Sequence, residues 1–228
     1  MDCDGTLYDK DKCNYQDISV AAFYKALGAY NISRKEANKK QSDLSKRGIH
    51  GLLNVALDLC NQRKIPFRYF SNTMARNTNY DLMPPDKNML QLLEQLGHKI
   101  PIYIVTDNTW IHLFHIIKRL NDGNFKQFCD LNITPIAIED TLYEDFFHPK
   151  EENGQFLNLC AQVGLMPHEV LVLDDTEEIC AAAHAQGLQV KRIQNPKQTK
   201  AVLRRLIDER TKAKRSVSIR KARDRAGR

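Results

Sequence analysis

Two pairs of acidic residues are the part of this sequence best suited to chemistry. Asp2 and Asp4 lie at the start, and Asp174 and Asp175 directly follow the apolar run 170–173. Acids that follow an apolar strand lie at the carboxyl end of a sheet, where open α/β folds bind ligands. Four carboxylates gathered there would repel one another unless a cation neutralised them. Magnesium is the natural candidate, because it prefers oxygen ligands from carboxylates, phosphates and water.

A second group of residues could bind the oxygens of a phosphate. Thr106 follows the apolar run 102–105, and its hydroxyl and the next backbone N–H groups, near a helix start, suit a phosphate oxygen. Asp107 comes next in the chain and is assigned to the same group, and Lys150 adds a positive charge. A nucleophilic carboxylate, an acid/base, a cation and hydrogen-bonding groups are the parts of a phosphoryl-transfer site.

The elements that must position these residues follow an alternating pattern. From residue 100 onward, apolar runs of strand length alternate with amphipathic runs of helix length, which predicts an α/β fold with a parallel sheet covered by helices. We expect strands at 101–105, about 133–138, 170–173 and 188–193, and helices at 110–120, 155–163, 177–186 and about 197–210. On the helix 110–120 we interpret His112 and His115 as surface residues.

Residues 12–98 follow a different pattern, with helical spacing of apolar residues and no alternation typical of strands. They predict a mostly helical insert, in which the polar stretch 70–81 forms a loop and Pro84 and Pro85 mark the return to the sheet. We therefore expect a core formed by 1–11 and 99–210 and a helical cap formed by 12–98.

Composition excludes several classes of protein. Of the 228 residues, 42% are apolar and 27% are charged, which is typical of a globular protein rather than a disordered one. Apolar runs fall far short of the ~20 residues that cross a bilayer, and the start resembles no secretion signal, so we expect a cytoplasmic protein. The six cysteines are dispersed with no C-x-x-C pair, which argues against a zinc site. Oligomeric state stays open.

The positive charge is concentrated at the end of the chain. Residues 191–228 contain 15 Lys and Arg against 3 Asp and Glu, whereas residues 1–190 contain 19 against 25. In 211–228 only Val217 and Ile219 are large and apolar, so we predict a disordered basic tail. A solvated extension is the favoured interpretation, and attachment to nucleic acid through residues 211–228 is the alternative.

Four segments, taken together, resemble the motifs of the haloacid dehalogenase (HAD) superfamily of aspartate-nucleophile phosphohydrolases. Residues 2–8 resemble the first motif, Thr106 the second, Lys150 the third, and 174–176 the fourth. Phe156, six residues after Lys150, and Gly187 also fall where the family places such residues, and the resemblance covers roughly 1–193. It implies a Rossmann-like core with a helical cap inserted after the first motif.

The resemblance also implies roles for the site residues. Asp2 would be the nucleophile and Asp4 the acid/base, while Thr106, Asp107 and Lys150 would form the phosphate-binding group. Mg²⁺ would be bound by Asp2, Asp4 through its backbone carbonyl, Asp174 and, in support, Asp175.

An acid two residues after the nucleophile is typical of the family's phosphatases, so the implied activity is Mg²⁺-dependent hydrolysis of a small phosphomonoester. Residues 47–52 and 81–84 resemble the pyrimidine 5'-nucleotidase branch, which implies a nucleoside 5'-monophosphate as substrate.

The sequence departs from the family at its start. Relatives place an apolar strand before the first Asp, but here only Met1 precedes Asp2, so the first core strand is missing from these residues. Either the native start lies upstream or the chain is truncated, and misplacing a nucleophile by ~1 Å can cost ~100-fold in rate. The alternative function is therefore a catalytically impaired HAD-like protein that acts by binding.

Overall fold

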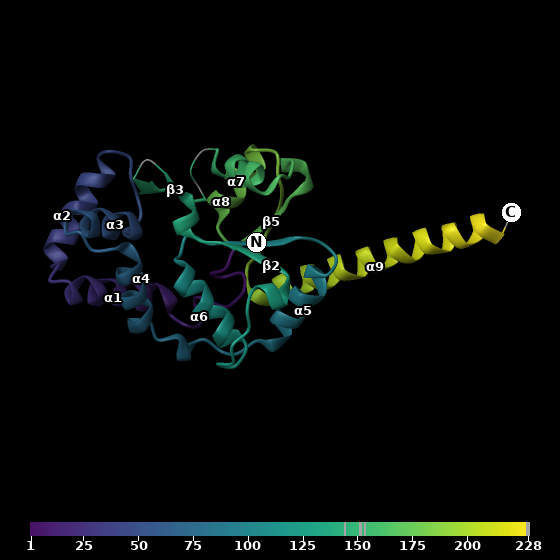
Figure 1. The fold of residues 1–228 in the computed structure, drawn as a ribbon, viewed down its shortest axis with the longest axis horizontal. Helices are drawn as coiled ribbons and strands as arrows, with labels where there is room; N and C mark the ends of the chain where they lie inside the picture. The colour runs from purple at the N-terminus through teal and green to yellow at the C-terminus, as the bar shows by residue number, and fades with distance from the viewer. Residues whose placement is uncertain (144, 151, 153, 227–228) are drawn as a thin grey trace.

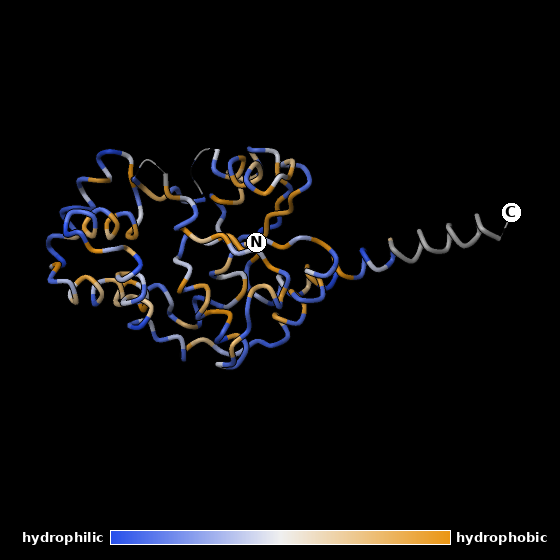
Figure 2. Tube along the Cα trace, viewed as in Figure 1, coloured by the Kyte–Doolittle hydropathy of each residue, from blue (hydrophilic) through white to orange (hydrophobic). Residues whose placement is uncertain are grey.

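The computed structural model describes the backbone of residues 1–143, 145–150, 152 and 154–226, and side chains within these ranges except at 143 and beyond 213. Its strands and the helices beside them form one lobe, four helices form a second, and the last helix extends away from both (Figure 1). Figure 2 shows apolar segments converging near the N-terminus, inside the first lobe. Within the described residues, no helix is long and apolar enough to cross a membrane.

The parallel strands confirm the predicted α/β pattern. Strand β1 (Ile102–Val105) pairs with β2 (Ile133–Ile136), and β5 (Leu171–Asp174) pairs with β6 (Gln189–Arg192), both in parallel. The expected helices are α6 (Trp110–Leu120), α7 (Gln155–Val163) and α8 (Glu177–Ala185). A short antiparallel pair, β3 (Leu142–Tyr143) and β4 (Phe146–Phe147), was not predicted, because two residues are too few to show alternation. Single 3₁₀ turns are η1 (Tyr80–Leu82), η2 (Cys129–Leu131), η3 (Ile138–Thr141) and η4 (Pro167–Glu169).

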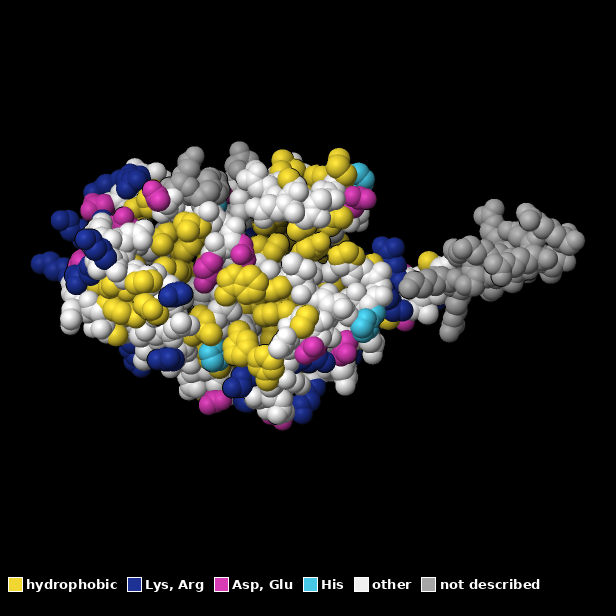
Figure 3. Space-filling model, in the orientation of Figure 1, with side chains coloured by type: hydrophobic (Ala, Val, Ile, Leu, Met, Phe, Trp, Pro, Cys, Tyr) yellow, Lys and Arg dark blue, Asp and Glu magenta, His cyan; other side chains and the backbone are white. Residues whose placement is uncertain are grey.

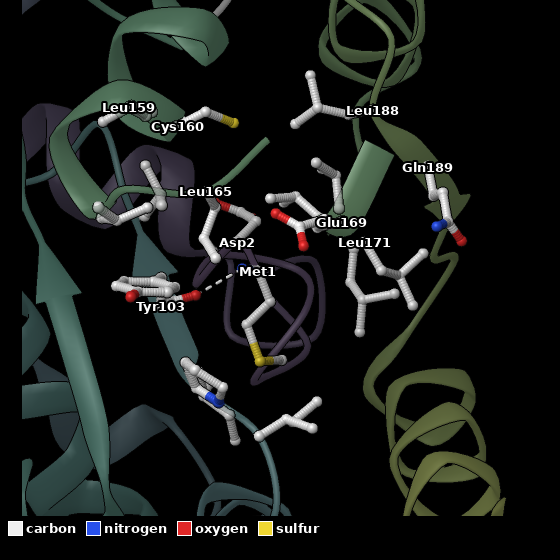
Figure 4. A pocket seen from close by; sticks show the side chains of 18 of the residues that line it. Met1, Asp2, Tyr103, Leu159, Cys160, Leu165, Glu169, Leu171, Leu188 and Gln189 are labelled. Carbon is white, nitrogen blue, oxygen red and sulfur yellow. Dashed lines mark hydrogen bonds between the residues drawn. The ribbon is translucent and has the colours of Figure 1, made fainter. Parts of the chain in front are cut away.

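Met1 and Asp2 lie between the two pairs of strands. The N–H of Asp2 donates to the carbonyl of Leu173 at 2.8 Å, and the carbonyl of Met1 accepts from the N–H of Val105 at 2.9 Å. The α-ammonium of Met1 donates to the carbonyl of Tyr103 at 2.6 Å, as Figure 4 shows. A cavity of about 360 Å³, lined mainly by apolar side chains, lies beside Met1 between β1 and β5 (Figure 4). The first motif is thus bonded to both strands at their carboxyl ends.

The second lobe is helical, as expected for the insert. Helices α1 (Tyr15–Ala29), α2 (Arg34–Ser45), α3 (Leu52–Gln62) and α4 (Phe67–Asn77) pack around their own apolar cluster, which includes Phe23, Leu27, Leu44, Leu59 and Phe70. The prediction of a loop over 70–81 is wrong for 70–77, because Phe67, Phe70 and Met74 have helical spacing and pack on that cluster. Lysines and arginines gather on the outside of this lobe, many of them on α2 (Figure 3).

Helix α5 (Lys87–Gly97) packs with the sheet rather than with the second lobe. Its residues Met89, Leu93 and Leu96 join a cluster with Ile102 of β1 and Leu113 of α6. This packing differs from the expected cap boundary at residue 98. The physical reason is that the return segment at Pro84 and Pro85 precedes α5, so α5 follows the crossing into the first lobe.

Helix α9 (Pro196–Ala226) is longer than predicted. We expected a helix end near 210 and a disordered tail over 211–228, but the backbone stays helical through Ala226, and 227–228 lie outside the described residues. Residues 211–226 contain neither Gly nor Pro and are rich in Ala, Lys and Arg, which have high helix propensity. Leu203, near the start of α9, is buried against the sheet lobe and anchors the helix.

Candidate active site

A buried lysine joins two carboxylates at the carboxyl ends of the strands. Nζ of Lys150 donates to Oδ1 of Asp2 at 2.6 Å and to Oδ2 of Asp174 at 2.9 Å. The three side chains are only 5%, 8% and 2% exposed, respectively. Asp174 is the last residue of β5, and Asp2 is bonded to the same strand through its backbone. The sequence predicts one site that contains Lys150, Asp2 and Asp174, and the structure brings their side chains into contact.

One cation shared by two carboxylates leaves this cluster with excess negative charge. The pKa of Asp2 is raised to about 7, chiefly by burial; the charge of Lys150 opposes this rise, and the nearby carboxylates of Asp174 and Asp4 add to it. Burial also opposes the charge of Lys150, but the carboxylates of Asp2, Asp107 and Asp174 outweigh that effect and raise the pKa of its ammonium well above the ordinary value. Lys150 therefore stays charged, and a second cation would relieve the repulsion between the acids.

Three of the predicted metal ligands lie close enough to bind one ion. Asp2, Asp174 and Asp175 each offer an oxygen, and these oxygens lie within 4.8 Å of one another. Hard oxygen donors with excess negative charge fit Mg²⁺. The side chain of Asp4 lies outside this group, so any contribution from Asp4 would come from its backbone carbonyl. Lys10 forms an ion pair with Asp175 at 2.6 Å, a contact that the sequence gave no means to predict.

Gly5 allows Asp175 to approach the first motif. Its φ of +81° lies in the left-handed region, and a Cβ at this position would lie 2.4 Å from Oδ2 of Asp175. Any side chain would therefore meet both backbone strain and a direct clash. The glycine of the first motif is thus needed to bring the first and fourth motifs together.

Asp4 is surrounded by hydrogen-bond donors. The Tyr8 hydroxyl donates to Oδ1 and the Asn108 amide donates to Oδ2, both at 2.5 Å. Nε2 of His112 lies 3.3 Å from Oδ1. Burial acts to raise the pKa of Asp4, but the contacts with His112, Tyr8 and Asn108 outweigh it and lower the pKa. Asp4 is therefore held as a carboxylate, the form that can accept a proton from water.

The interpretation of His112 as a surface residue is wrong. His112 is only 4% exposed, and its ring lies against Asp4 rather than in solvent. A signal was present in the sequence, because His112, Ile116 and Leu120 are spaced by four residues and share the buried face of α6. Asn108 was also missed as a partner of Asp4, although it directly follows the expected phosphate-binding pair.

The predicted phosphate-binding residues lie at the end of β1 and beside Lys150. Thr106 is buried; its N–H donates to the carbonyl of Ile136 at 3.0 Å, and its hydroxyl accepts from the N–H of Asn108 at 3.2 Å. Oδ1 of Asp107 accepts from the backbone N–H of Lys150 at 3.0 Å and so holds the segment that carries the lysine. Contact of Thr106, Asp107 and Lys150 with phosphate stays a prediction.

A cavity of about 220 Å³ lies between the helical lobe and the loop after β1. Its wall includes Asp107 and Asn108 from the loop and Phe23, His50 and Asn54 from the helices. Asn54 is fixed by three hydrogen bonds: it donates to the carbonyls of His50 at 2.8 Å and Phe147 at 3.0 Å, and accepts from the N–H of Phe147 at 2.8 Å. These contacts join α3 to β4 and give the cavity a rigid polar wall.

Among known proteins, this chain is similar to solved structures but not to any family model or curated sequence that was compared. The proposed HAD hydrolase YfnB from Bacillus subtilis, whose structure is bound to magnesium, has a TM-score of 0.51 and 14% identity over 89% of this chain and 96% of its own.

Two further structures are also similar. A hydrolase from Pseudomonas syringae has a TM-score of 0.48 and 18% identity, over 90% of this chain and 87% of its own. The HAD family enzyme bt-2542 from Bacteroides thetaiotaomicron, in complex with magnesium and inorganic phosphate, has a TM-score of 0.47 and 14% identity, over 84% of this chain and 90% of its own.

We base the fold assignment on YfnB, because its TM-score exceeds 0.5. The chain has the mixed α/β fold, with parallel strands, that is found in HAD-type hydrolases. The YfnB structure is bound to magnesium, and the described residues of this chain include a cluster of three aspartates whose oxygens lie close enough to hold a metal ion.

Proposed function

We propose that this protein is a Mg²⁺-dependent phosphohydrolase that uses an aspartate nucleophile on a small phosphomonoester. The observation that carries this proposal is the bridge from Lys150 to Asp2 and Asp174, with Asp4 two residues from Asp2. A solvated acidic turn would have no reason to bury a lysine between two carboxylates, since the desolvation cost is several kcal/mol for each ion.

In this mechanism Asp2 and Asp4 divide the chemistry. A carboxylate oxygen of Asp2 attacks phosphorus, the bond to the leaving alkoxide breaks, and an aspartyl-phosphate forms. Asp4 is a carboxylate in the free protein and must bind a proton before this step. It gives that proton to the alkoxide, and the resulting carboxylate then takes one from the water that hydrolyses the aspartyl-phosphate. Lys150 and the groups at Thr106 stabilise the negative charge on the transferred oxygens. The donors around Asp4 fix its position for both proton transfers.

Mg²⁺ supports the same reaction. Asp2, Asp174 and Asp175 would bind it, together with the backbone carbonyl of Asp4. When bound, the ion supplies positive charge that offsets the repulsion between the carboxylates and the phosphate. The magnesium in YfnB supports this choice of ion.

A nucleoside 5'-monophosphate is the substrate that we propose. The cavity of about 220 Å³ beside Asp107 has aromatic walls, Tyr15, Phe23 and Phe147, which suit a planar base. His50 adds a polar side chain to the wall that could distinguish one base from another. The resemblance of residues 47–52 to the pyrimidine 5'-nucleotidase branch points to the same substrate class.

The test is hydrolysis of p-nitrophenyl phosphate and of a nucleotide panel, with Mg²⁺ or with EDTA. We expect Mg²⁺-dependent release of phosphate that Asp2→Asn abolishes. The matched control Asp43→Asn, on the exposed face of α2, should retain full activity. A folded wild-type chain that is silent on every substrate would support the non-catalytic alternative instead. Activity that survives Asp2→Asn would exclude Asp2 as the nucleophile.

A further inference from the structure

His112 contacts both chain segments that connect helices α1–α4 to the sheet lobe. Tyr15 is the first residue of α1, where the chain enters the helical lobe from the first motif. Tyr80 lies in η1, where the chain returns from α4 to the sheet lobe. The Tyr15 hydroxyl lies 3.0 Å from Nδ1 and 3.1 Å from Nε2 of His112. The Tyr80 hydroxyl lies 3.0 Å from Nδ1. The two connections of the helical lobe thus meet at one imidazole ring.

The same ring contacts Asp4. Nε2 of His112 lies 3.3 Å from Oδ1 of Asp4, and a carboxylate can only accept a hydrogen bond. Nε2 therefore carries the proton and donates it. This leaves the single lone pair of Nδ1 to accept from one tyrosine hydroxyl at a time, while the other tyrosine packs against the ring. This tautomer follows from the partners of the ring. It gives a chain of hydrogen bonds from one connection at a time, through His112, to the carboxylate, with the second tyrosine in contact with the same ring.

Ring packing holds this chain of groups in place. The Tyr15 and His112 rings lie with centroids 5.0 Å apart, and the Tyr80 and His112 rings 5.6 Å apart. Tyr8, which also donates to Asp4, packs edge-on against Tyr15 at 5.7 Å. Movement of either connection would thus shift a ring that contacts His112. Neither the nucleophile nor the metal cluster takes part in these contacts.

We propose that His112 is a positioning residue that couples the seating of the helical lobe to the orientation of Asp4. When both connections are seated, Tyr15 and Tyr80 hold the imidazole and the imidazole holds Oδ1 of Asp4. When the lobe swings away, the imidazole loses its tyrosine partners and Asp4 loses one of its three donors. The carboxylate of Asp4 is then correctly placed to transfer protons only while the helical lobe covers the substrate. The proposal rests on the role proposed above for Asp4.

Two substitutions at His112 separate positioning from simple packing. His112→Gln keeps a donor and an acceptor on a long side chain, whereas His112→Leu keeps the volume but removes both. With p-nitrophenyl phosphate we expect His112→Leu to lower kcat by about 10- to 100-fold, the scale of a misplaced catalytic group, with KM changed less than about twofold. His112→Gln should recover most of kcat. The matched control is His184→Gln, on the exposed side of α8.

A double-mutant cycle tests the coupling to the connections. Tyr15→Phe and Tyr80→Phe should each lower kcat in the wild-type chain and have no further effect in His112→Leu, because the route to Asp4 is already broken. Additive losses would overturn the proposal, since they would mean that the tyrosines act independently of His112.

Hydrogen exchange of the full chain separates failure of this proposal from failure of the proposed function. His112→Leu should speed amide exchange in 9–18 and 78–84 and leave α3 unchanged, whether or not the protein hydrolyses phosphate. If the wild type is inactive but exchange rises in both connections, the proposed function fails and the linkage to the lobe stands. If the wild type is active and His112→Leu retains its kcat, or if exchange is unchanged, the coupling is overturned.

Discussion

Replacing Lys150 by methionine should destabilise the metal-free protein strongly. Lys150 donates to Asp2 at 2.6 Å and to Asp174 at 2.9 Å, and none of the three side chains is more than 8% exposed. Methionine fills a similar volume but leaves two buried carboxylates without a cation. Removing one partner of a buried ion pair typically costs 3–5 kcal/mol, so we expect a loss of about 4 kcal/mol in the free energy of unfolding.

Mg²⁺ should restore part of the stability that Lys150→Met loses. This response distinguishes a site that binds cations from an ordinary ion pair. Without Lys150 the three aspartates carry more unbalanced charge, so Lys150→Met should bind Mg²⁺ more tightly than the wild type. An ion present at 100 times its Kd stabilises the folded state by about 2.7 kcal/mol. Urea unfolding at pH 7.5, in EDTA and across a Mg²⁺ series, measures both effects.

The matched control is Lys126→Met, which breaks a partly exposed ion pair with Glu94 at 2.9 Å. It should cost less than about 1 kcal/mol and show no added response to Mg²⁺. A loss below about 1 kcal/mol for Lys150→Met would refute the idea that the lysine neutralises buried acids. Equal stabilisation of Lys150→Met and wild type by Mg²⁺ would refute a shared cation site at Asp2, Asp174 and Asp175.

Three further outcomes follow from the same geometry. Gly5→Ala should lower the free energy of unfolding by about 2 kcal/mol or more, since it adds left-handed strain of ~1–2 kcal/mol to the clash with Asp175. Thermal unfolding followed by circular dichroism measures this loss, and an unchanged melting temperature would contradict the prediction. Burial lowers the pKa of the Met1 ammonium from 8.0 to about 6. The unfolded chain therefore binds more protons between these values, and stability should rise by about 2 kcal/mol from pH 6 to pH 8. Comparing the unfolding midpoints of free and N-acetylated chains isolates this contribution, and equal slopes would contradict it. Burial raises the pKa of Asp2 from 3.8 to about 7, so Mg²⁺ must displace a proton from this carboxyl below pH 7. Mg²⁺ affinity should therefore rise about tenfold per pH unit between pH 5 and 7 and level off at higher pH. Calorimetric titration checks this, and an affinity that does not change with pH would exclude Asp2 as a ligand.

Regular alternation made the sheet lobe predictable. The strands of four residues, β1, β2, β5 and β6, were all expected. Strands β1 and β5 lie in apolar runs that the sequence displays directly, whereas β6 is mostly exposed. The proximity of Asp2, Lys150 and Asp174 followed from their places at strand ends or in a motif. Predictions failed where long-range packing decides the outcome. Helix α4 is polar in composition, so its sequence was interpreted in part as a loop. Its apolar face is buried because it packs on the apolar cluster of the helical lobe, which includes Phe23.

The site residues that sequence reasoning missed are those whose role depends on a partner far along the chain. His112 contacts Asp4 across 108 positions and Tyr15 across 97. Local spacing places His112 on the buried face of α6 but does not reveal which group it meets there. The length of α9 was missed for the opposite reason. Its end depends on local helix propensity, whereas we judged residues 211–228 by their lack of apolar residues for packing.

The bonding of Met1 has a practical consequence for how the protein is handled. Its α-amine donates to Tyr103 (Figure 4), and its carbonyl accepts from the N–H of Val105, one residue from the proposed nucleophile. An affinity tag or leftover protease-site residues at this end would enter the apolar cavity or pull Asp2 away from Leu173. The opposite end, on α9, extends away from both lobes (Figure 1). Purification handles and surface-attachment chemistry for this chain therefore belong on the carboxyl end.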